Sequence, residues 1–140
     1  MILVDTSVWI DVLKDRNGAT TRAFRSRVGD QIIVFSRFIQ LELLQGAKDE
    51  HEWCRLDDYL ATQYYLEAEE NTWRHAARLY FELRRSGKTV RSPIDCCIAC
   101  VAMESSALLL HRDHDFETIA GIAPLDNEFF NPFSRPGATD

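Results

Sequence analysis

Short apolar runs alternate along the chain with longer segments in which apolar residues recur at helical spacing. The runs predict buried strands at 2–4, 31–35, 64–66 and 107–110, and an edge strand at 122–125. The other segments predict helices at 20–28, 36–44, 49–60, 69–85, 92–105 and 115–120, after a first helix that Thr6 or Ser7 caps and Asn17–Gly18 ends. This alternation is typical of an α/β fold with a mostly parallel sheet. Ligands of such sheets bind beyond the carboxyl ends of the strands.

The length and composition predict one domain with its own hydrophobic core. The chain has 140 residues, of which 46% are hydrophobic and 27% are charged, and this excludes disordered, collagen-like and disulfide-scaffold proteins. We expect the domain to span 1–130, and the Pro, Gly, Ser and Thr content of 131–140 predicts a loose tail. No basic stretch followed by an apolar one opens the chain, and no apolar run is long enough to span a membrane. The sequence therefore predicts a cytoplasmic protein.

Three of the four cysteines crowd into one apolar helical segment, with Cys54 elsewhere. Cys97 and Cys100 have the spacing of a redox pair or of half a zinc site, but no second pair of this kind exists. The apolar neighbours favour a third interpretation, in which Cys96, Cys97 and Cys100 are buried as small hydrophobic residues in a reducing compartment.

Acidic residues recur where the predicted strands end. Asp5 ends the first strand, Glu42 lies on the helix after the second, and Asp95 lies in the first turn of the helix that begins at Ser92–Pro93. Asp113 and then Asp115 follow the last strong strand. Taken alone, each of these acids has an ordinary explanation as a helix cap, a dipole partner or a solvated side chain. Together they are delivered to one edge of the sheet, where the fold class places a site.

Clustered carboxylates need a cation. Two of them about 4 Å apart repel by about 4 kcal/mol at an effective dielectric constant near 20. Several of them stay ionised in a cleft only with a positive partner, and an all-oxygen ligand set selects Mg²⁺ or Mn²⁺. Such an ion activates water and neutralises charge on a scissile phosphate. The acids therefore predict a metal-dependent phosphodiesterase.

Four segments, in order, are similar to the PIN-domain family, and specifically to the VapC-type ribonuclease toxins of type II toxin–antitoxin systems. They are 2–9 (ILVDTSVW), the LELLQG segment around Glu42, 89–99 (TVRSPIDCCIA) and 111–116 (HRDHDF). The resemblance implies a PIN-like α/β/α sandwich with a central, mostly parallel sheet. It implies a metal site formed by Asp5, Glu42, Asp95 and Asp113, with Asp115 as an accessory ligand. Thr6 or Ser7 would support the carboxylate network.

The resemblance also implies a reaction and partners. The reaction would be hydrolysis of RNA, often structured RNA such as tRNA, leaving a 5′-phosphate and a 3′-hydroxyl. A homodimer and a silencing VapB-type antitoxin are implied as well. The sequence departs from the family at His111, where many members have Thr or Ser; His111 is interpreted either as a contact to substrate phosphate or as a histidine at the edge of the core. The larger aromatic residues are expected to serve packing, with some at a dimer surface or in an antitoxin groove.

The net charge of −6 excludes a protein that holds nucleic acid by bulk positive charge. Positive charge is local instead, and Arg91 and Arg112 flank the proposed ligands in sequence, which makes them candidates for contacts to RNA phosphates.

Three other functions are compatible with an α/β fold that carries acids at one edge of its sheet. A receiver-type signalling domain is disfavoured, because Thr6–Ser7 follow Asp5 where a second acid is required and no late lysine is present. A catalytically idle PIN-like interaction module is disfavoured by the intact set of acids. A metal-dependent DNA nuclease is the third alternative, and composition does not exclude it.

Overall fold

A computed structural model of the chain describes residues 1–133, so most of the expected tail lies outside the described residues. The described part contains one sheet of four strands in the order β2-β1-β3-β4. The strands are β1 (Ile2–Val4), β2 (Ile33–Val34), β3 (Leu108–His111) and β4 (Asn127–Phe129). Every neighbouring pair is parallel, which confirms the predicted α/β class.

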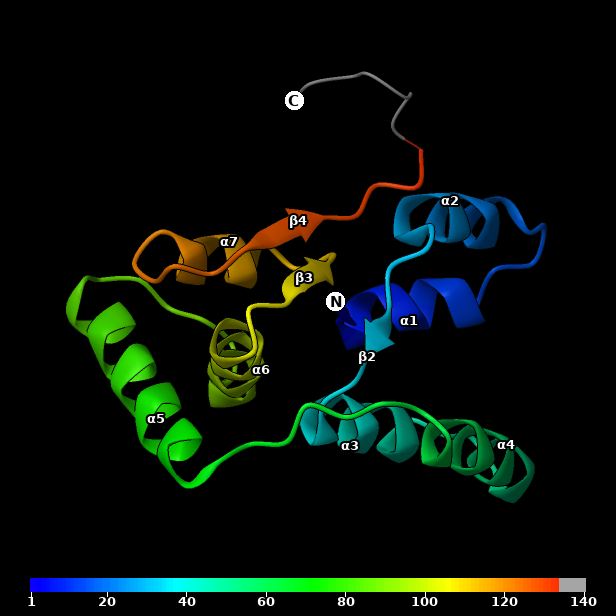
Figure 1. The fold of residues 1–140 in the computed structure, drawn as a ribbon, viewed down its shortest axis with the longest axis horizontal. Helices are drawn as coiled ribbons and strands as arrows, with labels where there is room; N and C mark the ends of the chain where they lie inside the picture. Colours follow the sequence, from blue (N-terminus) through cyan, green and yellow to red (C-terminus); the bar gives the residue numbers. More distant parts are fainter. Residues whose placement is uncertain (134–140) are drawn as a thin grey trace.

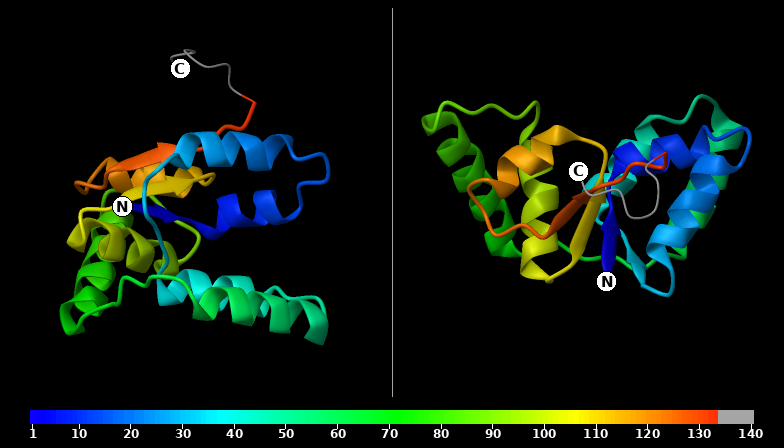
Figure 2. Two further views of the ribbon diagram at one scale, coloured as in Figure 1. Left: turned by 45° about the vertical axis from the view of Figure 1, so that its right-hand side comes forward. Right: turned by 90° about the horizontal axis from the view of Figure 1, so that it is seen from above.

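Helices cover the sheet from both sides. They are α1 (Thr6–Leu13), α2 (Ala19–Val28), α3 (Arg37–Gln45), α4 (Glu50–Ala61), α5 (Glu70–Arg85), α6 (Pro93–Glu104) and α7 (His114–Ala120). Figure 1 shows α5, α6 and α7 to one side of the strands and α1 and α2 to the other, with α3 and α4 below. Seen from above in Figure 2, the two groups of helices spread apart beyond the carboxyl ends of the strands. The expected α/β/α sandwich is confirmed.

The central strands are apolar throughout because both of their faces are covered. Ile2, Leu3 and Val4 are fully buried, as are Leu109 and Leu110 opposite them. This explains why β1 and β3 are continuous apolar runs rather than alternating ones. The backbone N–H of Asp5 donates to the carbonyl of Leu110 at 2.9 Å, so the ladder continues one residue beyond Val4 and fixes the backbone of Asp5.

The edge strand lies five residues later than predicted. The apolar run at 122–125 contains Pro124, which has no N–H for a sheet, and the N–H of Leu125 closes a tight turn on the carbonyl of Ala123 at 2.8 Å. Strand β4 is mostly polar instead, and its polar side chains have partners: Asn127 contacts His111, and Glu128 binds Arg27 of α2. Because polar contacts hold this edge strand in place, its sequence lacks the apolar pattern by which a strand is recognised.

Three other expected bounds change. Strand β2 is shorter than 31–35, and the expected strand at 64–66 is reduced to a single bridge between Phe35 and Tyr65. Helix α1 ends at Leu13 rather than at Asn17–Gly18, and Gly18, with a φ of +82°, begins α2 instead. The cap of α1 is Asp5 rather than Thr6 or Ser7.

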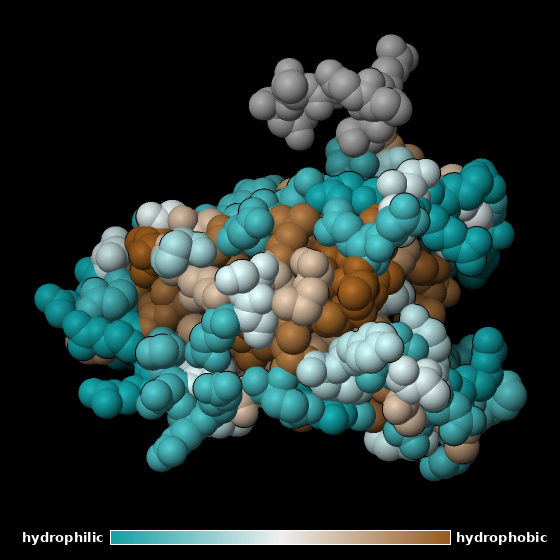
Figure 3. All heavy atoms as spheres, in the orientation of Figure 1, coloured by the Kyte–Doolittle hydropathy of each residue, from teal (hydrophilic) through white to brown (hydrophobic). Residues whose placement is uncertain are grey.

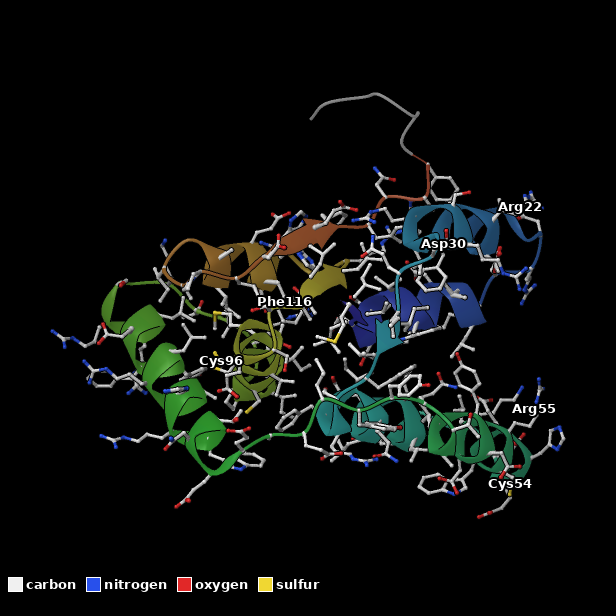
Figure 4. All side chains as sticks on the ribbon, viewed as in Figure 1. Arg22, Asp30, Cys54, Arg55, Cys96 and Phe116 are labelled. Atoms are coloured by element: carbon white, nitrogen blue, oxygen red, sulfur yellow. The ribbon has the colours of Figure 1, made fainter. Side chains whose placement is uncertain are left out.

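The cysteines of α6 belong to the core, which supports their interpretation as small hydrophobic residues. Cys96, Cys97 and Cys100 are buried, whereas Cys54 is exposed on α4, far from α6 in Figure 4. All four are free thiols. Burial raises the pKa of Cys96 to about 12 and that of Cys100 to about 11, so these thiols stay protonated.

The amino ends of the strands form a face with apolar character. Figure 3 shows apolar residues over the middle of this face and hydrophilic residues over the outer helices. Met1 and Ile32 are exposed apolar residues at this end of the sheet. No helix in residues 1–133 combines the length and the apolar character that crossing a bilayer requires. The acids gather at the opposite, carboxyl end.

Candidate functional site

The first turn of α6 delivers Asp95 to the carboxyl edge of the sheet. Ser92 caps the helix by accepting a hydrogen bond from the N–H of Ile94 at 3.1 Å, and Pro93 takes the first helical position. Asp95 follows in the first turn, where the helix dipole favours a negative charge. The sequence signals for the start of this helix are therefore also the signals that place a site residue.

Asp113 and Asp115 approach the same point from the end of β3. Asp113 caps α7 by accepting a hydrogen bond from the N–H of Asp115 at 3.0 Å, which holds the two carboxylates side by side. One carboxylate oxygen from each of Asp95, Asp113 and Asp115 lies within 4.8 Å of the others. Asp115, expected only as an accessory, belongs to the closest group of three.

Asp5 is held rigidly at the end of β1. Its Oδ2 accepts hydrogen bonds from the backbone N–H of Ser7 at 3.0 Å and from the Ser7 hydroxyl at 2.6 Å. The Ser7 oxygen in turn accepts the backbone N–H of Arg112 at 2.9 Å. Ser7 therefore ties the Asp5 carboxylate to the segment that carries Asp113.

Glu42 reaches the site from α3. Its Oε1 accepts a hydrogen bond from the Thr6 hydroxyl at 3.2 Å, which links the start of α1 to α3. Neither Asp5 nor Glu42 joins the group of three described above, but both act on it through charge.

The electrostatics show that the acids share one pocket. Burial raises the pKa of Asp5 against the lowering effect of its hydrogen bonds to Ser7. Burial also raises the pKa of Glu42, and the charges of Asp5 and Asp113 raise it further. The largest shift is at Asp95: burial, followed by the charges of Asp113, Asp5, Glu42 and Asp115, raises its pKa to about 7. Each acid disfavours ionisation of its neighbours.

These acids fit a divalent metal ion. The donor set consists of carboxylate oxygens alone, which is the preference of hard ions such as Mg²⁺ and Mn²⁺. A bound cation would relieve the repulsion that, after burial, raises the pKa values of Glu42 and Asp95. Asp95, Asp113 and Asp115 meet closely enough to hold such an ion together.

Arg91 supplies positive charge at the rim of the site. Its guanidinium contacts Asp113 at 2.5 Å and Asp115 at 3.4 Å, and its backbone N–H donates to Asp115 at 3.1 Å. The side chain is 79% exposed, so its outer surface is open to a ligand. Arg112, the second arginine candidate, forms its ion pair with Asp11 of α1 at 3.1 Å.

His111 does not offer a surface to RNA, which corrects one of its two interpretations. The side chain is fully buried between the rings of Phe116 and Phe129. Its Nδ1 accepts the backbone N–H of Asp113 at 3.2 Å, so the ring proton belongs on Nε2, which lies 2.9 Å from Oδ1 of Asn127. His111 is a core residue that positions Asp113.

Two residues of this network were not identified from the sequence. Asp11 lies four positions after Ser7 on the same face of α1, a spacing that relates it to the site. Asn127 carried no such signal, because its role depends on the unexpected position of β4.

Comparison with known proteins agrees with the fold. A sequence model of the PIN domain matches residues 2–122. VapC ribonuclease Mb1587 of Mycobacterium bovis and ribonuclease VapC11 of Mycobacterium tuberculosis are each 33% identical over 133 residues, which cover 93% of this chain and 99% of the relative.

Two solved structures illustrate the similarity of fold. VapBC2 from Rickettsia felis, bound to a DNA fragment from its promoter, gives a TM-score of 0.75 at 20% identity, over 94% of this chain and 100% of the other. Mycobacterium tuberculosis VapC20, a toxin that cleaves the sarcin–ricin loop, gives 0.66 at 20% identity, over 90% and 99%. These findings agree with the four sequence segments described above and with the parallel sheet. This chain belongs to the PIN-domain family, among its VapC proteins.

Proposed function

We propose that this protein is the toxin of a VapBC-type toxin–antitoxin system and acts as a metal-dependent endoribonuclease. The observation that carries the proposal is the convergence of five carboxylates, from β1, α3, α6 and the β3–α7 segment, on one edge of the sheet. The names of the relatives, which are ribonucleases, support RNA as the substrate. Such an activity places the protein in the cytoplasm, where cellular RNA is found.

The chain holds the ion and orients its own acids. Asp95, Asp113 and Asp115 supply the closest ligand oxygens, and Asp5 and Glu42 complete the negative pocket. When bound, Mg²⁺ or Mn²⁺ supplies an activated water and neutralises charge on the scissile phosphate. The Ser7 hydroxyl fixes one oxygen of Asp5, while Thr6 orients Glu42. These fixed hydrogen bonds reduce the reorganisation that catalysis requires.

Arg91 provides a positively charged contact for an RNA phosphate in a protein whose overall charge is negative. Its exposed guanidinium lies directly beside Asp113, so a phosphate held by Arg91 is also beside the proposed metal. Arg contacts phosphate through a planar fork of donors, which positions a strand without reading its bases. We propose that the substrate is a structured RNA such as a tRNA.

Brief induction in bacterial cells followed by mapping of RNA 5′ ends tests the function and the substrate together. We expect growth arrest and new 5′-phosphate ends at a small set of RNA positions. Asp5→Asn should abolish both effects, whereas Asp30→Asn, which removes an equal charge from an exposed residue, should leave both unchanged. New ends that also appear with Asp5→Asn, in a protein that is folded, would contradict the proposal.

A groove beside α4 supports an antitoxin as the partner. A cavity of about 610 Å³ lies between α1, α3 and α4, with apolar residues in its wall and charged residues at its rim. The apolar residues of the wall include Trp9, Leu13, Leu43, Leu56, Tyr59 and Leu60. An apolar groove with a polar rim suits an amphipathic helix. VapBC-1 from nontypeable Haemophilus influenzae, a complex of toxin and antitoxin, shares the fold at a TM-score of 0.73.

Relief of the growth arrest tests this partner. Co-expression of the small reading frame next to this gene should restore growth, and the two proteins should purify together. Leu56→Asp places a charge in the groove and should weaken that complex, whereas Arg84→Asp on α5 should not. We also propose that the free toxin is a homodimer, which light scattering after gel filtration measures.

A further inference from the structure

A second, polar cavity adjoins the acidic site. It has a volume of about 440 Å³ and lies where the end of α1, the loop before α2 and the segment after β3 meet. Asp11, Lys14, Asp15, Arg16, Arg112 and Phe133 are among the residues of its wall. We call it the α1–α2 cavity. Its volume falls within the range of about 300–1,000 Å³ that is typical of small-ligand sites.

The α1–α2 cavity is connected to the acids through Arg112 and α1. Arg112 directly precedes Asp113, and its backbone N–H bonds the same Ser7 oxygen that holds Asp5. Ser7, Asp11 and Lys14 lie on one face of α1, at positions i, i+4 and i+7. The eight residues of α1 span about 12 Å, so a strand that follows this face runs from the acids to the cavity.

The cations of this cavity are available and its acids are not. Asp11 is paired with Arg112 at 3.1 Å. Asp15 accepts the backbone N–H and the hydroxyl of Thr21 at 2.9 and 2.8 Å. Lys14 and Arg16 are exposed, and no acid among residues 1–133 forms an ion pair with either of them. With Lys14 and Arg16 the wall carries three cations, including Arg112, against two acids, Asp11 and Asp15, in a protein whose net charge is −6.

Phe133 adds an open aromatic ring. Its side chain lies in the cavity wall and is 77% exposed. Its backbone N–H donates to the side-chain oxygen of Asn131 at 3.1 Å. None of the ring contacts within the described residues involves Phe133. Exposed aromatic rings beside unpaired cations are the elements with which proteins hold single-stranded nucleic acid.

We propose that the α1–α2 cavity binds one nucleotide of the RNA strand next to the cleavage site. Lys14 and Arg16 hold its backbone phosphates, and the base stacks on Phe133. This inference rests on the proposed ribonuclease function and extends it, since it assigns a positioning site outside the metal-binding acids. A flanking nucleotide held there fixes which phosphate reaches Asp95 and Asp113.

Binding of a fluorescein-labelled single-stranded RNA of 12 nucleotides and mixed sequence tests this site, with EDTA present to prevent cleavage. The double variant Lys14→Gln, Arg16→Gln should bind more weakly. The slope of the logarithm of the RNA association constant against the logarithm of the salt concentration should fall by about 1.4 in magnitude. Each contact to a single-stranded phosphate contributes about 0.7 to this slope, and the variant removes two. The matched control is Lys48→Gln, Arg74→Gln, which removes equal charge from the loop before α4 and from α5 and should keep the parent slope.

The aromatic contact has its own test with the same RNA. Phe133→Ala should lower affinity roughly five- to 150-fold, the range that loss of one stacked base gives. Phe133→Tyr keeps the ring and should restore the parent affinity. Far-UV circular dichroism confirms that the variants are folded.

The outcomes separate this site from the function on which it rests. If the parent binds and cleaves RNA in Mn²⁺ but the double variant keeps the parent affinity and salt slope, the cavity is not an RNA site. If the control loses as much as the double variant, the effect is general charge and the inference is wrong. A parent that binds RNA with these slopes but never cleaves it contradicts the ribonuclease proposal and leaves the binding site supported.

Discussion

Asp95 is the acid of the site whose pKa is raised furthest, which makes it the best probe of the proposed metal site. Its pKa of about 7 results from burial and from the four neighbouring acids, so about half of the molecules carry a proton there at neutral pH. A metal ion and this proton compete for the same carboxylate. Proton release on binding is therefore a measurable signature of the site.

Mn²⁺ affinity should rise with pH through about 7. Below the pKa of Asp95 a proton must leave before the carboxylate can bind, so affinity should fall up to about tenfold for each pH unit below 7 and level off above pH 8. Electron paramagnetic resonance of free Mn²⁺ measures this at pH 6, 7 and 8. Asp95→Asn should bind weakly at every pH. Equal affinity of the parent at pH 6 and pH 8 would show that Asp95 is not a ligand.

His111 should matter for folding rather than for RNA. His111→Leu keeps an apolar group between Phe116 and Phe129 but leaves the N–H of Asp113 and the side chain of Asn127 without their partner. Loss of a buried hydrogen-bond partner costs about 1–3 kcal/mol, which urea denaturation measures. Metal-free RNA affinity should stay at the parent value. If His111→Leu kept the parent stability but bound RNA more weakly, His111 would contact RNA, contrary to what its burial indicates.

Among the elements, helix α6 has strong sequence signals at its first turn and a buried middle. Its cap, its Pro and its acid face the site, while seven consecutive residues from Cys96 to Ala102 are buried. Burial of this stretch agrees with the three thiols serving as small apolar residues of the core. The apolar neighbours of these cysteines in sequence already indicated this.

Thiol labelling tests the burial of α6. Ellman's reagent should modify one thiol of the native protein, Cys54, and four after denaturation, because the other three are inaccessible and burial raises their pKa. Cys54→Ser should give no reaction in the native state. Rapid labelling of two or three thiols in native Cys54→Ser would place α6 at the surface.

The elements that could be predicted from sequence are those with a local signal. Strands β1 and β3 are apolar because they are covered on both faces, and α3, α4 and α6 begin at Ser36, Asp49 and Ser92, whose side chains cap them. Strand β4 had no local signal in the sequence, because its polar side chains are stabilised by residues that are distant in sequence, Arg27 and His111. The acids could be assigned to one edge, but only the three-dimensional arrangement shows that Asp115 lies within the closest group.

In the whole molecule, the parallel sheet brings acids that are far apart in sequence to one edge. Residues as far apart in sequence as Asp5 and Asp113 meet because β1 and β3 are neighbours and end together. Part of the net charge of −6 is therefore concentrated where a cation would offset it, and the positive charge that we propose contacts RNA lies around these acids. An overall acidic charge is compatible with a nucleic-acid enzyme when its charges are arranged in this way.

The central claim is that these carboxylates hold the ion with which the protein cuts RNA. The most direct measurement is single-turnover cleavage of total tRNA by purified protein as Mn²⁺ is titrated, with Asp95→Asn and the exposed Asp30→Asn compared at equal concentration. We expect saturable Mn²⁺-dependent cleavage by the parent and by Asp30→Asn, and a loss of at least 100-fold, or roughly 3 kcal/mol, in Asp95→Asn. Cleavage by folded Asp95→Asn at the parent rate, or parent cleavage that persists in EDTA, would contradict the account.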